Sequence, residues 1–243
     1  MPASAGLKLQ FSEVEKRYGM RLALRGVNLT FAAGECVALV GHNGSGKTTL
    51  LKIAAQLTRP SRGKIAFYAR ENPVSLEEVK SQVGMVGHHT LLYEELTAEE
   101  NLIFFAKLFG LADPAQKARQ ALEPVGLASR ASDLVRTFSR GMRQRLSIAR
   151  ALLASPGLLL LDEAGTGLDP EGQQWLAASI RRLRDSGCTI LMSTHGRNET
   201  QTAVTRAIRL EAGKITHDSG AAGDPKKILV MAAVRENGEE GEA

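Results

Sequence analysis

Short apolar segments alternate with amphipathic ones along this chain of 243 residues. Leu7–Phe11 and Val27–Phe31 alternate apolar and polar residues, which predicts two strands of a small antiparallel sheet. Cys36–Val40 is continuously apolar, as expected of a central parallel strand that is buried on both faces. The same patterns predict further strands at Ile65–Tyr68, Val83–Val86, Leu158–Leu161, Thr189–Met192 and Ala207–Leu210.

The apolar period becomes helical after Leu96. Apolar residues then recur at helical spacing at Leu102, Ile103, Phe105, Ala106, Leu108 and Phe109. Asp113 and Pro114 look like the capped start of another helix, with the proline at its first position. We therefore expect a mainly helical subdomain from about residue 90 to about residue 155, and another helix over Pro170–Arg184. Strands alternate with helices on both sides of this insert, which favours an α/β fold with a mostly parallel sheet.

Composition supports a globular chain. With 43% hydrophobic and 23% charged residues, the chain can bury a substantial core. No apolar run approaches the roughly 18 to 20 residues that span a bilayer, and the first residues lack the apolar segment of a secretory signal. We expect a cytoplasmic protein with a polar, flexible tail over residues 221–243. Cys36 and Cys188 lie in predicted core segments, which favours free buried thiols.

The net charge of +5 leaves several classes of partner open. Positive residues cluster at positions 136 to 150 and 181 to 184, where their spacing suits a solvated helix face, a phosphate-bearing ligand or a partner protein. Nucleic acid is a further option by charge alone. However, aromatic residues do not interleave with the basic stretches, which disfavours a stacking platform for single strands. We expect no direct contact with nucleic acid.

One glycine-rich segment carries the clearest chemistry. It runs Gly41-His42-Asn43-Gly44-Ser45-Gly46-Lys47-Thr48-Thr49, matches the spacing G-x-x-x-x-G-K-S/T, and lies between an apolar strand and a helix. Glycines let successive backbone N–H groups turn toward phosphates, the lysine reaches the β/γ-phosphates, and the threonine hydroxyl can ligate Mg2+. The alternative is an ordinary glycine turn. Within the α/β pattern this segment predicts a P-loop NTPase core that binds a nucleoside triphosphate together with Mg2+.

A second signal is the apolar strand that ends in Asp162-Glu163. At the carboxyl end of a strand, the aspartate can orient Mg2+ and the glutamate can polarise an attacking water. The alternative is a strand that merely ends in exposed acids. Together with the glycine loop, the pair predicts a nucleotide-hydrolysing site.

Phe138-Ser139-Arg140-Gly141 and the residues that follow to Leu152 resemble the signature motif of ATP-binding-cassette (ABC) ATPases. Thr166-Gly167-Leu168-Asp169 resembles the D-loop of that family, and Ser193-Thr194-His195 its switch histidine. Tyr18 stands where the family places an aromatic residue that stacks on adenine. Motif order and spacing match over residues 7 to 217. The resemblance therefore implies a single ABC ATPase domain over residues 1–220, with an N-terminal antiparallel β subdomain and an inserted helical subdomain.

The resemblance also implies roles for individual residues. Lys47 and the loop from Gly41 to Thr49 would hold the phosphates, Thr48 and Asp162 would serve Mg2+, and Glu163 and His195 would act in catalysis. Ser139 and Gly141, and Asp169 of the D-loop, would belong to a site shared with the opposite subunit. Two copies would then clamp two ATP molecules head to tail. A separate integral-membrane permease would be the partner, with this chain peripheral on the cytoplasmic face of the membrane.

Three positions depart from the family pattern. His88 takes the place of a glutamine that senses Mg2+ and touches the membrane subunit, and an imidazole can partly replace an amide. Ala164 replaces a proline, and Arg140 replaces a glycine of the signature. The pattern Gly-His-x-x-x-Leu followed by Leu-Thr-Ala-x-Glu-Asn-Leu is similar to the ATP-binding subunit of haem exporters in cytochrome c maturation. Haem export is therefore one expectation, and export of another cargo the alternative.

Plainer readings remain for some of these features. Tyr18 could simply pack in a small sheet, and His195 could be a capped loop histidine. For Arg143 and Arg145 we favour a solvated helix face without a role in the site. A soluble ABC ATPase acting on DNA or ribosomes is a second class of function, but the interval between the phosphate loop and the signature has no sustained heptads. A phosphate-loop kinase is a third class, in which the signature would have no role.

Overall fold

A computed structural model describes residues 6–87, 89–194 and 202–230, and within them the strands form two sheets. The first sheet is antiparallel, in the order β2-β1-β4-β5. The second has the order β10-β9-β3-β8-β7-β6 and is parallel except for the pair β10–β9. The first sheet consists of β1 (Leu7–Tyr18), β2 (Arg21–Phe31), β4 (Arg62–Ala69) and β5 (Asn72–Val74). The second consists of β3 (Cys36–Val40), β6 (Val83–Val86), β7 (Leu158–Asp162), β8 (Thr189–Ser193), β9 (Arg206–Glu211) and β10 (Lys214–Asp218). The predicted fold class is confirmed.

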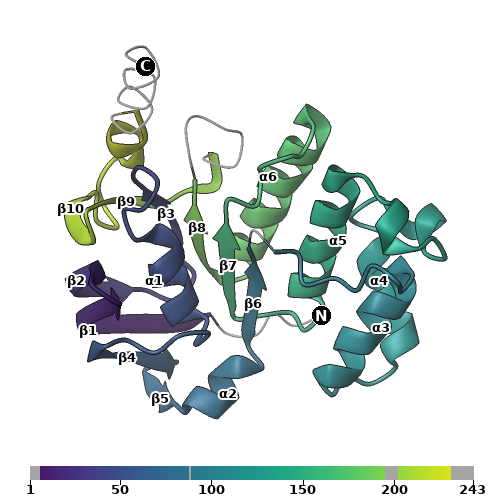
Figure 1. The fold of residues 1–243 in the computed structure, drawn as a ribbon, viewed down its shortest axis with the longest axis horizontal. Helices are drawn as coiled ribbons and strands as arrows, with labels where there is room; N and C mark the ends of the chain where they lie inside the picture. The colour runs from purple at the N-terminus through teal and green to yellow at the C-terminus, as the bar shows by residue number, and fades with distance from the viewer. Residues whose placement is uncertain (1–5, 88, 195–201, 231–243) are drawn as a thin grey trace.

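The helices fall into three groups around these sheets (Figure 1). Helix α1 (Lys47–Ala54) lies between the two sheets, and α6 (Pro170–Asp185) covers the far face of the parallel sheet. A separate helical group lies beside the parallel sheet and is inserted between β6 and β7. That group contains α3 (Ala98–Leu108), α4 (Pro114–Leu122), α5 (Arg140–Leu152) and the 3-10 turns η1 (Ala128–Arg130) and η2 (Val135–Thr137). The short α2 (Leu76–Lys80) joins β5 to β6.

Strand β3 shows how the parallel sheet divides the core. Its side chains alternate in direction: Val37 and Leu39 enter the core around α1, while Cys36, Ala38 and Val40 enter the core under α6. All five residues are buried. A strand with helices or sheets on both faces must be apolar at every position, and this is why the sequence reads as a continuous apolar run. The parallel strands also end at one edge, where the glycine loop, Asp162 and Ser193 lie.

The helical group has its own hydrophobic core. Its helices α3 and α4 begin in different ways. Thr97 and Glu100 form a capping box at the start of α3, which satisfies two backbone N–H groups that lack a helical partner. Pro114 occupies the first turn of α4, as predicted. The predicted side-chain cap by Asp113 is wrong, because Asp113 has a left-handed backbone (φ 49°) and its side chain makes no capping bond.

Several elements extend beyond the predicted boundaries. Strands β1 and β2 continue into a long hairpin, because register shifts between Phe11 and Arg17 let the pairing resume after each irregularity. Residues 225–230 lie in the predicted polar tail but are helical, and Ile228 and Leu229 are buried against the core under α6. Strands β5 and β10 and helix α2 were not predicted from the sequence. Cys36 and Cys188 are free and buried, as predicted.

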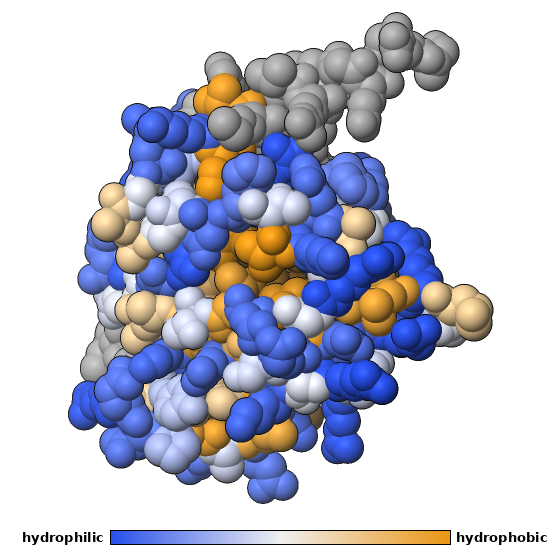
Figure 2. Space-filling model, turned by 90° about the vertical axis from the view of Figure 1, so that its left-hand side faces the viewer, coloured by the Kyte–Doolittle hydropathy of each residue, from blue (hydrophilic) through white to orange (hydrophobic). Residues whose placement is uncertain are grey.

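The surface that lies at the left of Figure 1 is mostly hydrophilic, with hydrophobic side chains gathered in a recess near its centre (Figure 2). Among the residues described by the structure, no helix combines the length and the apolar character that crossing a membrane requires.

Candidate functional site

The glycine loop connects β3 to α1 at the carboxyl edge of the parallel sheet. Gly41 and Gly46 have φ angles of 146° and 116°, which residues other than glycine rarely adopt. Space is equally restrictive, since a Cβ atom at Gly41 would lie 2.2 Å from the carbonyl oxygen of Leu210. The sequence therefore needs glycine here so that the backbone can curl before α1 begins. Such a curl aims N–H groups at the space above the helix N-terminus, which attracts anions.

The Lys47 side chain folds back over this loop. Its ammonium donates hydrogen bonds to the backbone carbonyls of Gly41 and of His42, the latter at 3.1 Å, and the residue is 5% exposed. The ammonium is thus held at the loop opening by carbonyl dipoles. A phosphate there would meet a cation that is already positioned.

Asp162 ends β7 beside the loop, and Glu163 follows it. The Thr48 hydroxyl donates to Asp162 Oδ1 at 3.2 Å, and the Ser193 hydroxyl donates to the same oxygen at 2.7 Å. Ser193 also accepts the backbone N–H of Glu163 at 3.0 Å. Glu163 has a φ of 56°, so the chain turns sharply just after Asp162. Mg2+ prefers oxygen ligands, and the Thr48 hydroxyl and the Asp162 carboxylate supply such oxygens.

A cavity of about 590 Å³ opens between the glycine loop and the tip of the β1–β2 hairpin. Eight predicted site residues line it: Tyr18, Asn43, Gly44, Gly46, Lys47, Thr48, Thr49 and Glu163. Tyr18 is 48% exposed, and the Lys16 ammonium lies 5.0 Å from its ring centroid. The tyrosine is thus not a core residue of the N-terminal sheet.

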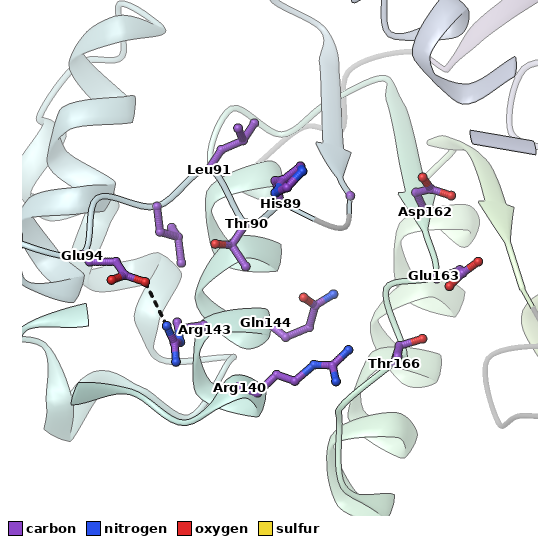
Figure 3. A pocket seen from close by; sticks show the side chains of 12 residues that line it. His89, Thr90, Leu91, Glu94, Arg140, Arg143, Gln144, Asp162, Glu163 and Thr166 are labelled. Carbon is purple, nitrogen blue, oxygen red and sulfur yellow. Dashed lines mark hydrogen bonds and ion pairs between the residues drawn. The ribbon is translucent and has the colours of Figure 1, made fainter. Parts of the chain in front are cut away.

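A second cavity, of about 670 Å³, lies on the other side of Glu163 (Figure 3). Asp162, Glu163 and Thr166 form one wall, and Thr90, Gln144 and other residues of the helical group face them. On the opposite side Arg143 pairs with Glu94 at 2.9 Å. Because Glu163 lines both cavities, it lies where the cavity at the glycine loop meets the helical group.

The start of α5 is tied to the segment that follows Glu163. Ser139 caps α5 by accepting the Met142 N–H at 3.2 Å. The buried Gln144 side chain donates to the Ala164 carbonyl at 2.8 Å, and Arg145 donates to Asp169 Oδ1 at 3.2 Å. These two bonds make the signature segment and the segment after β7 one packed unit.

Asp169 caps helix α6. Its Oδ1 accepts the Gly172 N–H at 2.8 Å, and this bond holds the pKa of the Asp169 carboxyl below its usual value, with a smaller contribution from Arg145. The acid therefore stays ionised at a helix N-terminus, where negative charge is favourable.

The predicted site residues do not all lie at one cavity. Gly41 and the fully buried Ser45 shape the glycine loop, and the His42 ring contacts the Asn43 carbonyl. Asp162 lines the second cavity. Ser139, Gly141 and Asp169 line neither of the two cavities. His88 and His195 fall outside the described residues.

Three residues that contribute to the site were not predicted from the sequence. Arg21 lines the cavity at the glycine loop, Ser193 connects Asp162 with Glu163, and Gln144 donates to the carbonyl of Ala164, the residue after Glu163. Of these three, only Arg21 could have been predicted from the sequence. It follows Tyr18 across a two-residue turn, and directly opposed residues of a hairpin project from the same face.

The strand–loop–helix with its buried lysine, next to an acidic strand end, defines a phosphate-loop nucleotide-binding protein. The family model described as "ABC transporter" matches residues 24–166. The chain belongs to the ABC transporter family and is an ATP-binding subunit that couples ATP hydrolysis to transport. This confirms the resemblance at the level of the family.

Individual relatives agree with this assignment. The Nod factor export ATP-binding protein I of Burkholderia lata is 38% identical over 208 residues, which cover 85% of this chain and 68% of that protein. The linearmycin resistance ATP-binding protein LnrL of Bacillus subtilis is 32% identical over 85% of this chain and 67% of that protein. Among solved structures, the dimer of the ATP-binding cassette MJ0796 bound to ADP and Pi is similar at a TM-score of 0.79. It is 27% identical and covers 89% of this chain and 100% of that chain.

Proposed function

We propose that this chain energises an export ABC transporter by hydrolysing ATP at a site that two copies share. The observation that carries the proposal is the 3.2 Å hydrogen bond between Thr48 and Asp162. It joins the glycine loop to the end of β7 across 114 positions of sequence and brings phosphate-binding and acidic groups together.

The residues at the cavity divide the chemistry among them. Lys47 and the loop N–H groups bind the β- and γ-phosphates. Thr48 and Asp162 would hold Mg2+, which would supply positive charge beside the phosphates. Glu163 orients a water molecule toward the γ-phosphorus and accepts its proton. The water oxygen forms a new bond to phosphorus while the bond to the β-phosphate bridging oxygen breaks, which yields ADP and inorganic phosphate.

The second half of the site comes from another copy of the chain. Ser139 and Gly141 stand at the N-terminus of α5, where unsatisfied N–H groups attract a phosphate, yet they line neither described cavity of their own subunit. A head-to-tail dimer would bring them to the γ-phosphate of the partner's nucleotide. The dimeric state of the related cassette bound to ADP and Pi supports this arrangement.

The membrane partner is a permease that contacts the surface between the second cavity and α3. Large hydrophobic side chains are exposed there: Leu91 is 59%, Tyr93 50% and Phe104 40% exposed. The Tyr93 and Phe104 rings pack edge to face at 5.0 Å. A cluster of exposed hydrophobic side chains on a protein surface marks a contact with another protein. A cytoplasmic segment of the permease would cover it and hold this chain peripherally on the cytoplasmic face of the membrane.

Export is supported by the relatives, which are named for Nod factor export and for linearmycin resistance. They favour an exporter of a cargo other than haem. The haem-exporter expectation, which rests on His88 and the pattern that follows it, finds no support in those names. The neighbouring reading frames would separate the two, since haem-handling membrane proteins beside this gene would restore it.

Purification of the tagged chain at native expression tests the proposal. A polytopic membrane protein should co-purify from detergent-solubilised membranes. Leu91→Glu should release that partner, whereas Leu57→Glu, which changes a leucine of similar exposure (65%) outside the proposed surface, should keep it. A fully soluble chain with no such partner would contradict the transporter role.

A further inference from the structure

We infer that Arg21 is a nucleotide-binding residue that contacts the α-phosphate of ATP. The inference rests on the proposed ATP site at the glycine loop and adds a second cation beside Lys47. Neither the motif pattern nor the family resemblance assigned Arg21 to the site.

The β1–β2 hairpin aims Arg21 at the loop. Tyr18 and Arg21 are the last cross-strand pair of the hairpin and are joined by Gly19 and Met20. Directly opposed residues of an antiparallel pair project from the same face. Both side chains accordingly line the 590 Å³ cavity together with Lys47 and the glycine loop.

Arg21 already touches that loop. Its Nη2 donates to the Gly44 carbonyl at 3.2 Å. A Cβ atom at Gly44 would lie only 2.5 Å from the same nitrogen, so the guanidinium approaches the backbone as closely as a glycine permits. Within the described part of the chain Arg21 forms no ion pair, and its charge faces the cavity without a carboxylate partner.

The position of Arg21 along the cavity indicates which phosphate of ATP it contacts. Lys47 and the loop N–H groups account for the β- and γ-phosphates, while Tyr18 marks the base end of the proposed site. Arg21 lies between them, across from Tyr18 and in contact with Gly44. The α-phosphate is the anionic group of ATP that occupies this interval, and a planar guanidinium can hold it with two parallel N–H bonds.

Calorimetric titration with ATP and with ADP, both in EDTA to prevent hydrolysis, tests the assignment. A charge-assisted bond to phosphate at an exposed position predicts that Arg21→Ala weakens both nucleotides by the same factor, about three- to tenfold. The nucleotide affinity of Arg21→Ala should also depend less steeply on salt concentration than that of the wild type. Arg21→Lys should recover part of the loss. Arg17→Ala removes the same charge from the same hairpin outside the cavity and should bind like the wild type.

Two results would overturn the inference. Wild-type affinity and salt dependence in Arg21→Ala would show that Arg21 does not touch the nucleotide, and a loss for ATP without a loss for ADP would place the contact at the γ-phosphate. Lys47→Ala separates this failure from failure of the ATP site itself. If Lys47→Ala also binds like the wild type, the glycine loop is not the site, whereas a loss with Lys47→Ala alone rejects only the role of Arg21.

Discussion

Ser193 joins the two acids at the end of β7: its hydroxyl donates to Asp162 Oδ1 at 2.7 Å and accepts the Glu163 N–H at 3.0 Å. Ser193 and Asp162 are almost fully buried. One serine on the adjacent strand thus fixes the carboxylate next to Thr48 and the sharp turn at Glu163. We expect this contact to control how well the chain holds Mg2+ and positions its proposed base.

Ser193→Ala should weaken both Mg2+ binding and the positioning of Glu163. Removal of the hydroxyl takes away the acceptor of the Glu163 N–H and one donor to Asp162, which costs about 1–3 kcal/mol of unfolding free energy. The Mg2+ concentration for half-maximal ATPase activity should rise several-fold. Ser147→Ala is the matched control, because its buried hydroxyl donates to the Thr90 carbonyl and not to an acid. If both variants show the same Mg2+ dependence, Ser193 does not position Asp162.

Gln144→Leu should uncouple the signature segment from the chain after Glu163. The substitution keeps the side-chain volume but leaves the Ala164 carbonyl without its 2.8 Å donor, at a cost of about 1–3 kcal/mol. We expect lower ATPase activity with unchanged ATP affinity, measured by steady-state kinetics and titration. Gln173→Leu removes only a long 3.4 Å bond to the Leu168 carbonyl and should have little effect. Equal activities of the two variants would reject a special role for Gln144.

The buried thiols should make the fold sensitive to alkaline pH. Burial raises the pKa of Cys36 and of Cys188 to about 12. Above about pH 9 the unfolded chain loses thiol protons that the folded chain keeps, so folding stability falls with rising pH until the folded pKa is reached. At pH 10.5 the loss is about 2 kcal/mol per thiol.

Urea unfolding at pH 8 and pH 10.5 measures this loss. The variant that carries both Cys36→Ala and Cys188→Ala should lose less stability between the two pH values than the wild type, although the cavities it creates lower its stability at pH 8. An identical pH dependence in both proteins would show that the thiols ionise as freely in the folded state as in the unfolded state.

The sequence predicted those parts of the site that depend on local chemistry. The glycine loop and Asp162-Glu163 were recognisable because spacing along one strand–loop unit determines their geometry, and the structure places Thr48 within hydrogen-bonding distance of Asp162. The parallel core strands were recognisable because burial on both faces requires an apolar residue at every position.

Contacts between distant segments were not predictable in the same way. Ser193 and Gln144 look like ordinary polar residues until strand order and helix packing bring them to Asp162 and Ala164. The helix α2 did carry a local signal, the capping box of Ser75 and Glu78, but it is only five residues long. The helical segment 225–230 was missed because its apolar residues are few and gain their burial only against the core under α6.

Analytical ultracentrifugation of Glu163→Gln with Mg2+ and ATP tests whether two copies of the chain share the ATP site. Loss of the proposed base should slow hydrolysis by about 100-fold or more while nucleotide binding persists. We expect an ATP-bound dimer that returns to monomer with ADP. A monomer saturated with ATP, or turnover at the wild-type rate, would contradict a shared site in which Glu163 activates water.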